Sequence, residues 1–186
     1  MRQIYFSIFF FLLSCDVAAQ DTILRFYRPF IVSETQQPLK IKAEYGGDCW
    51  RQSQRIVRED AMQCDVDGTR YDPCFVQAFN AQQQILCIDS PRASEAIQIN
   101  ASAPLDTQSY KTLDMSRTLP WAVELHDGDF CLSTDSKEMF DGLPVHYQCE
   151  HGMVLIGSVQ RCVAEWKILA HNARGISTAY IATAWF

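Results

Sequence analysis

The chain has 186 residues, a length that allows one domain or a larger domain with a small appendage. Hydrophobic residues make up 48% and charged residues 20%, which is the composition of a globular protein and excludes a disordered or fibrous chain. The formal net charge of −6 lacks the basic excess typical of nucleic-acid-binding proteins, so no nucleic-acid partner is expected.

The first 19 residues have the features of a secretory signal peptide. A positive start at Arg2 precedes an apolar run from Ile4 to Leu13, which is too short for a membrane-spanning helix of about 20 residues. The small residues Val17-Ala18-Ala19 match a cleavage site, so residues 1–19 are expected to be removed and residues 20–186 to form the mature protein.

A second interpretation of this segment is a bacterial lipobox. Leu12-Leu13-Ser14-Cys15 has the required cysteine, although Leu13 is bulkier than the residue usually found at its position. Cys15 would then carry a lipid and would be the only membrane attachment, because no later segment is apolar enough to cross a bilayer. The cleavage site after Ala19 is the better match.

The remaining cysteines form an odd-numbered set: Cys49, Cys64, Cys74, Cys87, Cys131, Cys149 and Cys162. In an oxidising compartment such a set predicts three disulfides and one free thiol. The spacing favours bonds between neighbours, Cys49–Cys64, Cys74–Cys87 and Cys131–Cys149, and leaves Cys162 free, but it does not fix the connectivity. No C-x-x-C motif of a zinc ribbon or thioredoxin-like site is present.

The first half of the mature chain predicts short strands and one short helix. Strands are expected over residues 22–32, 39–45, 85–88 and 96–101, with the second of them ended by Gly46-Gly47. Residues 55–63 mix apolar and charged side chains in a way that favours two helical turns. The polar residues 102–118 are the only candidate linker, interpreted as a long loop between two halves of one domain in preference to the alternative, a true domain boundary.

The second half predicts two hairpins and a closing strand over residues 176–186. In the first hairpin, over 121–132, a two-residue Asp127-Gly128 turn would set Leu125 opposite Phe130 and Val123 opposite Leu132. This register turns Cys131 away from the apolar pairs. A Cys131–Cys149 bond therefore requires either that both faces of the hairpin are covered or that the register differs by one residue.

The second hairpin is expected over residues 145–156 around His151-Gly152, with Tyr147, Cys149, Val154 and Ile156 on one face. Residues 163–170 are ambiguous between strand and helix. In total, the sequence predicts eight or nine short strands and at most one or two short helices. The fold class is therefore mostly β, arranged as a single domain stapled by disulfides.

None of the candidate chemical motifs carries a convincing signature. His126, His146 and His151 could hold a metal with an aspartate, but their spacing matches no metalloenzyme motif. Cys162 with His171 could form a thiol nucleophile, but no protease signature surrounds it. The stretch Asp65–Gly68 begins like a calcium loop but lacks the later ligands and favours a turn. No catalytic residue, metal ligand or cofactor is therefore predicted.

A set of motifs resembles a pattern in uncharacterised bacterial extracytoplasmic proteins. The set comprises Cys49-Trp50, Asp60-Ala61 with Cys64, Tyr71-Asp72-Pro73-Cys74-Phe75, Cys87, Pro91, Pro120-Trp121-Ala122, Asp127-Gly128 with Cys131, and Tyr147-Gln148-Cys149. The resemblance implies an envelope or secreted domain whose first four cysteines pair among themselves and whose Cys131 pairs with Cys149. Cys162 lies outside the pattern, and the resemblance brings no activity.

The expected function is that of an exported binding module that acts in the periplasm, at the cell envelope or outside the cell. Its ligand is undefined, and the acidic surface favours a basic protein partner. One alternative is an enzyme that hydrolyses envelope polymers with a pair of carboxylates among Asp60, Asp72, Glu124 and Asp127, a function less favoured than binding. The other is a structural lipoprotein, held by lipid at Cys15 or by a disulfide through Cys162.

Overall fold

The computed structural model describes residues 20–31, 38–77, 84–105 and 109–186, and these residues form an all-β protein without a helix. The signal peptide and Cys15 lie outside the described residues. The described strands are β1 (Ile23–Arg25), β2 (Lys40–Gln52), β3 (Ala61–Val66), β4 (Thr69–Val76), β5 (Ile85–Cys87), β6 (Glu95–Ala101), β7 (Ala122–Leu125), β8 (Phe130–Ser133), β9 (Met139–Phe140), β10 (Leu143–Cys149), β11 (Val154–Gln160), β12 (Trp166–Asn172) and β13 (Gly175–Trp185). The mostly-β fold class is confirmed, with more strands than expected.

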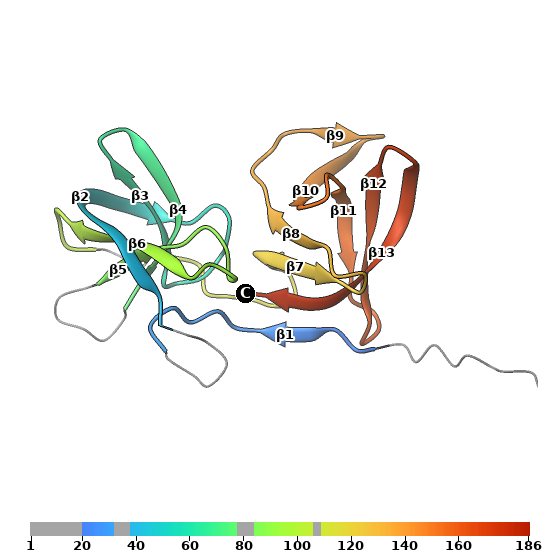
Figure 1. Ribbon diagram of the computed structural model, residues 1–186, viewed down its shortest axis with the longest axis horizontal. Coiled ribbons are helices and arrows are strands. Elements are labelled where there is room, and N and C mark those ends of the chain that lie inside the picture. Colours follow the sequence, from blue (N-terminus) through green and yellow to red (C-terminus); the bar gives the residue numbers. More distant parts are fainter. Residues whose placement is uncertain (1–19, 32–37, 78–83, 106–108) are drawn as a thin grey trace, which may run out of the picture.

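The first five strands after β1 close into an N-terminal barrel in the order β2-β3-β4-β5-β6 (Figure 1). Neighbouring strands are antiparallel except β2 and β6, which close the barrel as a parallel pair. The expected strands near 39–45, 85–88 and 96–101 correspond to β2, β5 and β6.

Two details of this barrel differ from expectation. The first is that the helix expected within residues 55–63 does not form, so that prediction is wrong. Residues 53–60 form the loop between β2 and β3. The hydroxyl of Ser53 accepts hydrogen bonds from the N–H groups of Arg55 and Ile56, both at 3.1 Å. The same hydroxyl donates to the Asp72 carboxylate on β4, so tertiary contacts override the local helical preference and the segment forms a turn instead.

The second difference is the length of β2, which does not end at Gly46-Gly47 but continues to Gln52. A Cβ atom at Gly47 would lie 2.6 Å from the main-chain oxygen of Asp65 and 2.9 Å from the Val66 side chain. A Cβ atom at Gly46 would have no neighbouring atom within 4 Å. Gly47 is therefore part of the strand because two backbones approach closely there.

A C-terminal barrel follows in the order β13-β12-β11-β10-β8-β7, closed by pairing of β7 with β13, while β9 pairs with β10. The long strand β13 pairs with β12 along its first part and with β7 along its last part. Strand β1 adds to the end of β13 in parallel. The strand expected over 22–32 thus covers three residues, and the ambiguous segment 163–170 contributes to β12.

The β7–β8 hairpin has a register one residue away from the expected one. Val123 pairs with Cys131 and Glu124 with Phe130. The turn is longer than two residues, because Gly128 N–H donates to Leu125 O and Leu125 N–H to Asp129 O, both at 2.9 Å. Gly128 has a φ of +89°, the left-handed conformation required at the last residue of such a three-residue turn. Cys131 consequently faces the core.

The β10–β11 hairpin shows a similar shift. Tyr147 faces the core as expected, but it pairs with Leu155, because the ladder is irregular between Val145 and Tyr147. Tyr147, Cys149 and Leu155 are buried together. An extra residue in one strand exchanges the faces of the residues that follow, which strict alternation along the sequence cannot reveal.

Three disulfides join cysteines on directly paired strands: Cys49 to Cys64 across β2–β3, Cys74 to Cys87 across β4–β5, and Cys131 to Cys149 across β8–β10. These are the pairs that the spacing favours. Cys162 carries an exposed free thiol. A disulfide framework of this kind indicates folding in an oxidising, extracytoplasmic environment.

An aromatic cluster packs the two barrels together. Tyr27, which follows β1, contacts Phe75 of the N-terminal barrel and Trp121 of the C-terminal barrel, with ring centroids 5.5 and 5.3 Å away. The Phe75 and Trp121 centroids are 5.7 Å apart. All three rings are buried, so the contact between barrels is an apolar core of its own.

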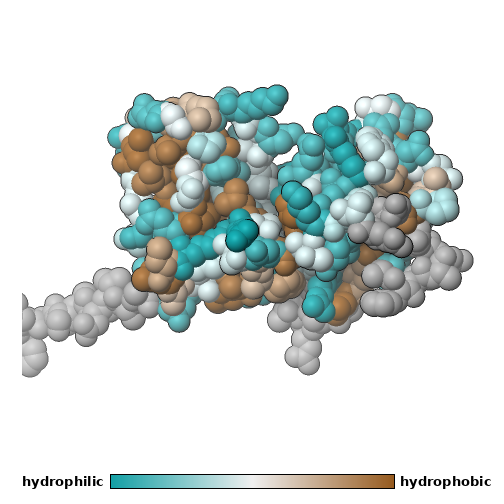
Figure 2. Space-filling model, turned by 180° about the vertical axis from the view of Figure 1, so that it is seen from behind, coloured by the Kyte–Doolittle hydropathy of each residue, from teal (hydrophilic) through white to brown (hydrophobic). Residues whose placement is uncertain are grey.

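Apolar side chains are unevenly distributed over the surface. Viewed from behind, brown patches gather mainly on the half formed by the C-terminal barrel (Figure 2). The exposed large apolar side chains of β1 and this barrel are Ile23, Leu24, Met139, Ile176 and Tyr180, with Phe26 and Val163 beside them. Within the described residues, no helix is suited to cross a membrane.

Candidate functional site

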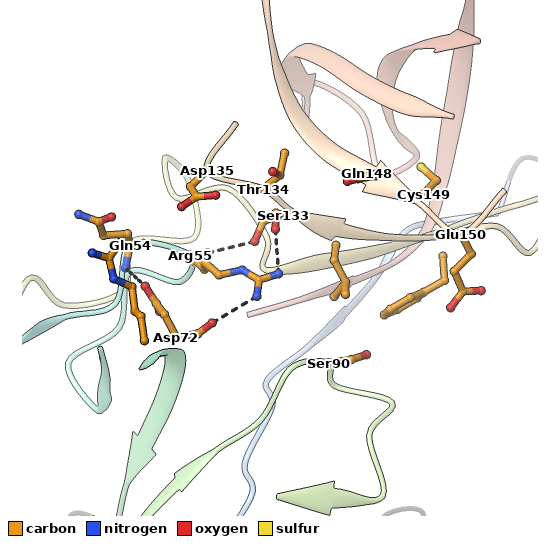
Figure 3. Close-up of a pocket in the computed structure, with 13 residues that line it drawn as sticks. Gln54, Arg55, Asp72, Ser90, Ser133, Thr134, Asp135, Gln148, Cys149 and Glu150 are labelled. Carbon is orange, nitrogen blue, oxygen red and sulfur yellow. Dashed lines mark hydrogen bonds between the residues drawn. The ribbon is translucent and has the colours of Figure 1, made fainter. Parts of the chain in front are cut away.

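A cleft of about 640 Å³ lies between the two barrels and is lined by residues of both (Figure 3). The N-terminal barrel contributes residues from the β2–β3 loop, strand β4 and the β5–β6 loop. The C-terminal barrel contributes the end of β8 and the β10–β11 turn. The polar and charged residues of the lining are Gln54, Arg55, Arg70, Asp72, Ser90, Ser133, Thr134, Asp135, Gln148 and Glu150.

Arg55 spans this cleft from one barrel to the other. Its Nη1 donates to the main-chain oxygen of Asp72 at 3.2 Å, and its Nη2 donates to the main-chain oxygen of Ser133 at 3.0 Å. The Ser133 hydroxyl donates to the Arg55 oxygen at 3.4 Å. Arg55 and Ser133 are 78 residues apart in the chain, so this bridge arises only from the tertiary fold.

Asp72 has an unusual environment on the N-terminal side of the cleft. Its carboxylate accepts hydrogen bonds from the Ser53 hydroxyl and, at 3.0 Å, from the Gln54 N–H. Burial raises the pKa of Asp72, while these hydrogen bonds and the positive charges of Arg55 and Arg51 oppose the rise. The result is a carboxyl group whose proton is held more tightly than on an exposed aspartate.

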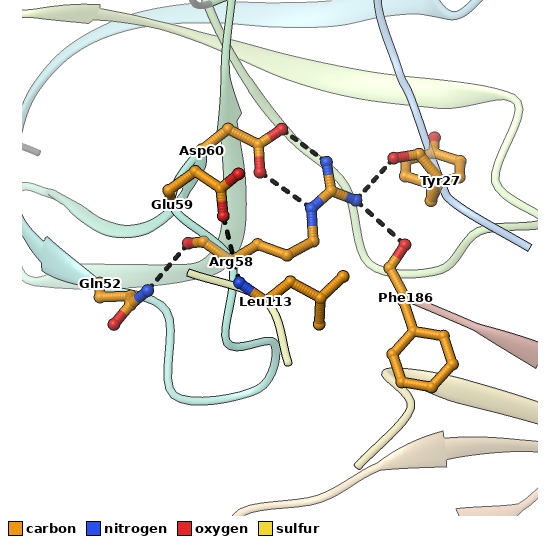
Figure 4. A network of polar contacts seen from close by, with 7 residues as sticks. All are labelled: Tyr27, Gln52, Arg58, Glu59, Asp60, Leu113 and Phe186. Carbon is orange, nitrogen blue, oxygen red and sulfur yellow. Dashed lines mark hydrogen bonds and ion pairs between the residues drawn. The ribbon is translucent and has the colours of Figure 1, made fainter. Parts of the chain in front are cut away.

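A second arginine fixes the barrels beside the cleft (Figure 4). Arg58 is 7% exposed and forms a two-point ion pair with Asp60, at 2.9 and 2.5 Å. Its Nη1 also donates to the main-chain oxygens of Tyr27 and Phe186, at 2.7 and 3.0 Å. Arg58 therefore joins the β2–β3 loop to the segment after β1 and to the end of β13.

Of the four carboxylates considered from the sequence, only Asp72 lines the cleft. Asp60 is occupied by Arg58, and Glu124 lies 2.7 Å from the Arg92 guanidinium. Asp127 accepts a hydrogen bond from Asp129 N–H within the β7–β8 turn. The other carboxylates of the cleft are Asp135 and Glu150, which no sequence pattern indicates.

The four histidines are not gathered into a metal site. His126 lies 3.8 Å from Glu165, His151 lies 2.9 Å from Asp129, and His171 stacks on Phe140 with ring centroids 3.8 Å apart. His146 is partly buried, which lowers its pKa. Within the described part of the chain, the only metal-like grouping is Cys64, Cys74 and Cys87, which are all bonded in disulfides.

The calcium-like stretch forms the tight turn between β3 and β4. Asp65 accepts a hydrogen bond from Gly68 N–H at 2.9 Å, and Val66 pairs with Thr69. Asp67 and Gly68 have φ values of 50° and 82°. This is the conformation of a two-residue hairpin turn, for which an Asp-Gly pair is well suited.

Comparisons of the chain with protein-family models, with curated proteins and with solved structures find no match. The functional argument therefore depends on the geometry of the cleft between the barrels.

Proposed function

We propose that this protein is an exported binding module whose ligand occupies the cleft between the two barrels. The observation that carries the proposal is that both barrels supply the walls of one polar cavity of about 640 Å³. Cavities of this volume accommodate small molecules or a few units of a polymer, and ligand sites commonly form where two structural units meet.

The placement of the cleft's polar groups supports binding rather than mere packing. Arg55 and Ser133 hold the two walls at a fixed spacing, which reduces the ordering that a ligand would have to impose. Gln148 and Glu150 are exposed and thus free to meet a ligand, whereas apolar lining is limited to side chains such as Phe130 and Leu132. The ligand is therefore expected to be polar.

The site of action follows from the disulfides and from the expected signal peptide. We place the protein in the periplasm, at the cell envelope or outside the cell, with an envelope component or an extracellular protein as partner. Lipidation at Cys15, or a disulfide through the exposed thiol of Cys162, would make it a structural part of an envelope assembly. Intact mass before and after reduction of the protein from its native host separates these cases.

A panel of envelope saccharides, peptides and proteins tests the binding function by isothermal titration calorimetry. Gln148→Trp adds a bulky side chain at an exposed position of the cleft and is expected to weaken binding of a panel member at least about tenfold. Thr178→Trp, on the exposed face of β13 and outside the cleft, is the control and should bind like the wild type. Equal binding by both variants would contradict the proposed site.

One observation favours hydrolysis as a second candidate function. A general acid needs a carboxyl group with a raised pKa, and Asp72 meets this condition in a cavity that also holds Asp135 and Glu150. An Asp72→Asn variant that binds saccharides but no longer releases reducing ends would support an enzyme. Absence of cleavage by the wild-type protein across the panel would remove this alternative.

A further inference from the structure

The cleft does not end at the Arg55 bridge. A second cavity of about 590 Å³ shares Gln54, Arg55, Ser133 and Thr134 with the first. A third, of about 520 Å³, shares Arg117, Leu119 and His146 with the second. The three hollows thus adjoin one another, from the seam between the barrels to the contact of the 116–119 segment with the C-terminal barrel. The second and third hollows are called the seam groove below.

The seam groove carries positive charge on a protein that is negative overall. It is lined by Arg55, Lys111, Arg117 and Arg161, which are four of the 16 lysines and arginines in the chain. Among the acidic residues that the structure describes, only Asp114 lines it. A concentration of cations against an opposite net charge creates a local field that attracts anions.

Two of these cations, Lys111 and Arg117, are only weakly neutralised. The Arg117 side chain is 88% exposed, and its Nε lies 3.7 Å from Asp114, a distance typical of a loose surface pair. Asp114 itself is engaged by Ser116, whose N–H and hydroxyl donate to its carboxylate at 3.0 and 2.6 Å. Among the described residues, the Lys111 ammonium has no ion-pair partner.

The segment that supplies Lys111 and Arg117 is held in place by both barrels. Gln52 exchanges two hydrogen bonds with the Lys111 main chain, at 2.6 and 3.1 Å. On the other side, Arg161 donates to the main-chain oxygens of Met115 and Thr118, at 2.5 and 2.8 Å, and lies over the Trp166 ring. The main chain that carries Lys111 and Arg117 is therefore held in place before a ligand arrives.

The remaining lining is rich in hydroxyl groups, which are supplied by Thr112, Ser116, Thr118, Ser133, Thr134 and Ser158. Hydroxyls donate and accept hydrogen bonds and suit a ligand that carries many hydroxyls of its own. His146 is partly buried, and burial lowers its pKa, so it adds hydrogen-bonding capacity but no charge at neutral pH.

We infer that the seam groove binds an acidic saccharide chain, with its carboxylate or phosphate groups on Lys111 and Arg117 and its hydroxyls on the serine and threonine side chains. The inference rests on the proposed binding function and names its ligand class. An extended groove with spaced cations fits a linear chain with repeated negative charges better than a single small anion.

Oligogalacturonate and its methyl ester provide a matched pair of probes, since esterification removes the charge of each carboxyl group and adds only a methyl group. Isothermal titration calorimetry should detect oligogalacturonate, with an affinity that falls as salt rises, and should find the methyl ester at least about tenfold weaker. A phosphorylated oligomannose in a parallel titration distinguishes phosphate from carboxylate as the preferred group. Equal binding of ester and acid, or binding of neither acidic saccharide, would overturn the inference.

The double variant Lys111→Gln/Arg117→Gln is expected to weaken oligogalacturonate binding about tenfold. Its control is Lys137→Gln/Arg174→Gln, which removes the same charge at exposed positions outside the groove and should change binding less than twofold. Equal losses in the two variants would mean that net charge, not the groove, attracts the ligand. Tighter binding of poly-L-glutamate than of either saccharide would replace the saccharide by an acidic peptide.

Failure of this inference can be told apart from failure of the proposed function. The first case is that a neutral panel member binds the wild type but not Gln148→Trp, and that acidic saccharides do not bind at all. This result would overturn the inference and leave the cleft as a binding site. Acidic saccharides that are lost only in Lys111→Gln/Arg117→Gln would support the groove and contradict the cleft.

Discussion

At the scale of single residues, the buried Arg58 fixes the arrangement on which the cleft depends. Arg58 donates hydrogen bonds to the Asp60 carboxylate and to the main-chain oxygens of Tyr27 and Phe186. Removing one partner of a buried charged network leaves the others without hydrogen bonds, which is the main cost of such a substitution.

We therefore predict that Arg58→Ala lowers the free energy of unfolding by about 2–3 kcal/mol. This loss is smaller than the loss on breaking a fully buried ion pair, because Asp60 is partly exposed. Arg117→Ala serves as the control, because its side chain is exposed and should change stability by less than about 0.5 kcal/mol. Urea denaturation measures both values. Equal effects would show that Arg58 does not join the barrels.

His151 offers a residue-scale test of electrostatics. Its Nδ1 lies 2.9 Å from Asp129, and this hydrogen bond, followed by the aspartate's charge, raises the pKa of His151 above its ordinary value. The pair thus stabilises the fold below the ordinary histidine pKa, and this contribution is lost as the pH rises through the raised pKa.

NMR titration should show the pKa of His151 falling toward its ordinary value in Asp129→Asn. The low pKa of His146, which has a different cause, should stay unchanged. An unaltered His151 titration would mean that the pair does not form in solution.

At the scale of elements, the strand patterns of the sequence succeeded where alternation is regular and failed where the backbone is irregular. The alternation after Leu39 indicates β2, and the apolar run before Phe186 indicates β13. The hairpin registers could not be predicted, because a three-residue turn at Gly128 and an irregularity near Val145 each shift the ladder by one residue. Neither leaves a distinct pattern in the residue types.

The two adjacent glycines of β2 give a direct test at this scale. Gly47→Ala should destabilise the N-terminal barrel by about 1–3 kcal/mol, because the added methyl group meets the Asp65 backbone at 2.6 Å. Gly46→Ala, with open space around it, should be neutral or slightly stabilising. Thermal unfolding of the two variants compares them. A reversed order would contradict the close approach of β2 and β3.

At the scale of the whole molecule, the cleft exists because two barrels are packed against each other. The sequence predicted the cysteine framework and the β class, both of which depend on local features and are confirmed by the structure. It indicated neither Arg55 nor Ser133, because residues 78 positions apart meet only after both barrels have formed. Asp72 is the one carboxylate proposed from the sequence that lies in the cleft. The sequence offered no feature that distinguishes it from Asp60, Glu124 and Asp127.

The aromatic cluster that joins the barrels should make them unfold together. We expect a single transition for the wild-type protein in scanning calorimetry, because Tyr27, Phe75 and Trp121 are buried between the barrels. Trp121→Ala should remove about 3–5 kcal/mol and separate or broaden the transition. Two independent transitions in the wild-type protein would show that this cluster does not couple the barrels.

The central claim, that both barrels contribute to one binding site, is tested most directly by hydrogen–deuterium exchange with the tightest-binding panel member at saturation. Binding in the cleft predicts slower exchange on both sides of it, in the β2–β3 loop around Arg55 and at the end of β8 around Ser133. Protection confined to one barrel, or located away from both segments, would contradict the claim.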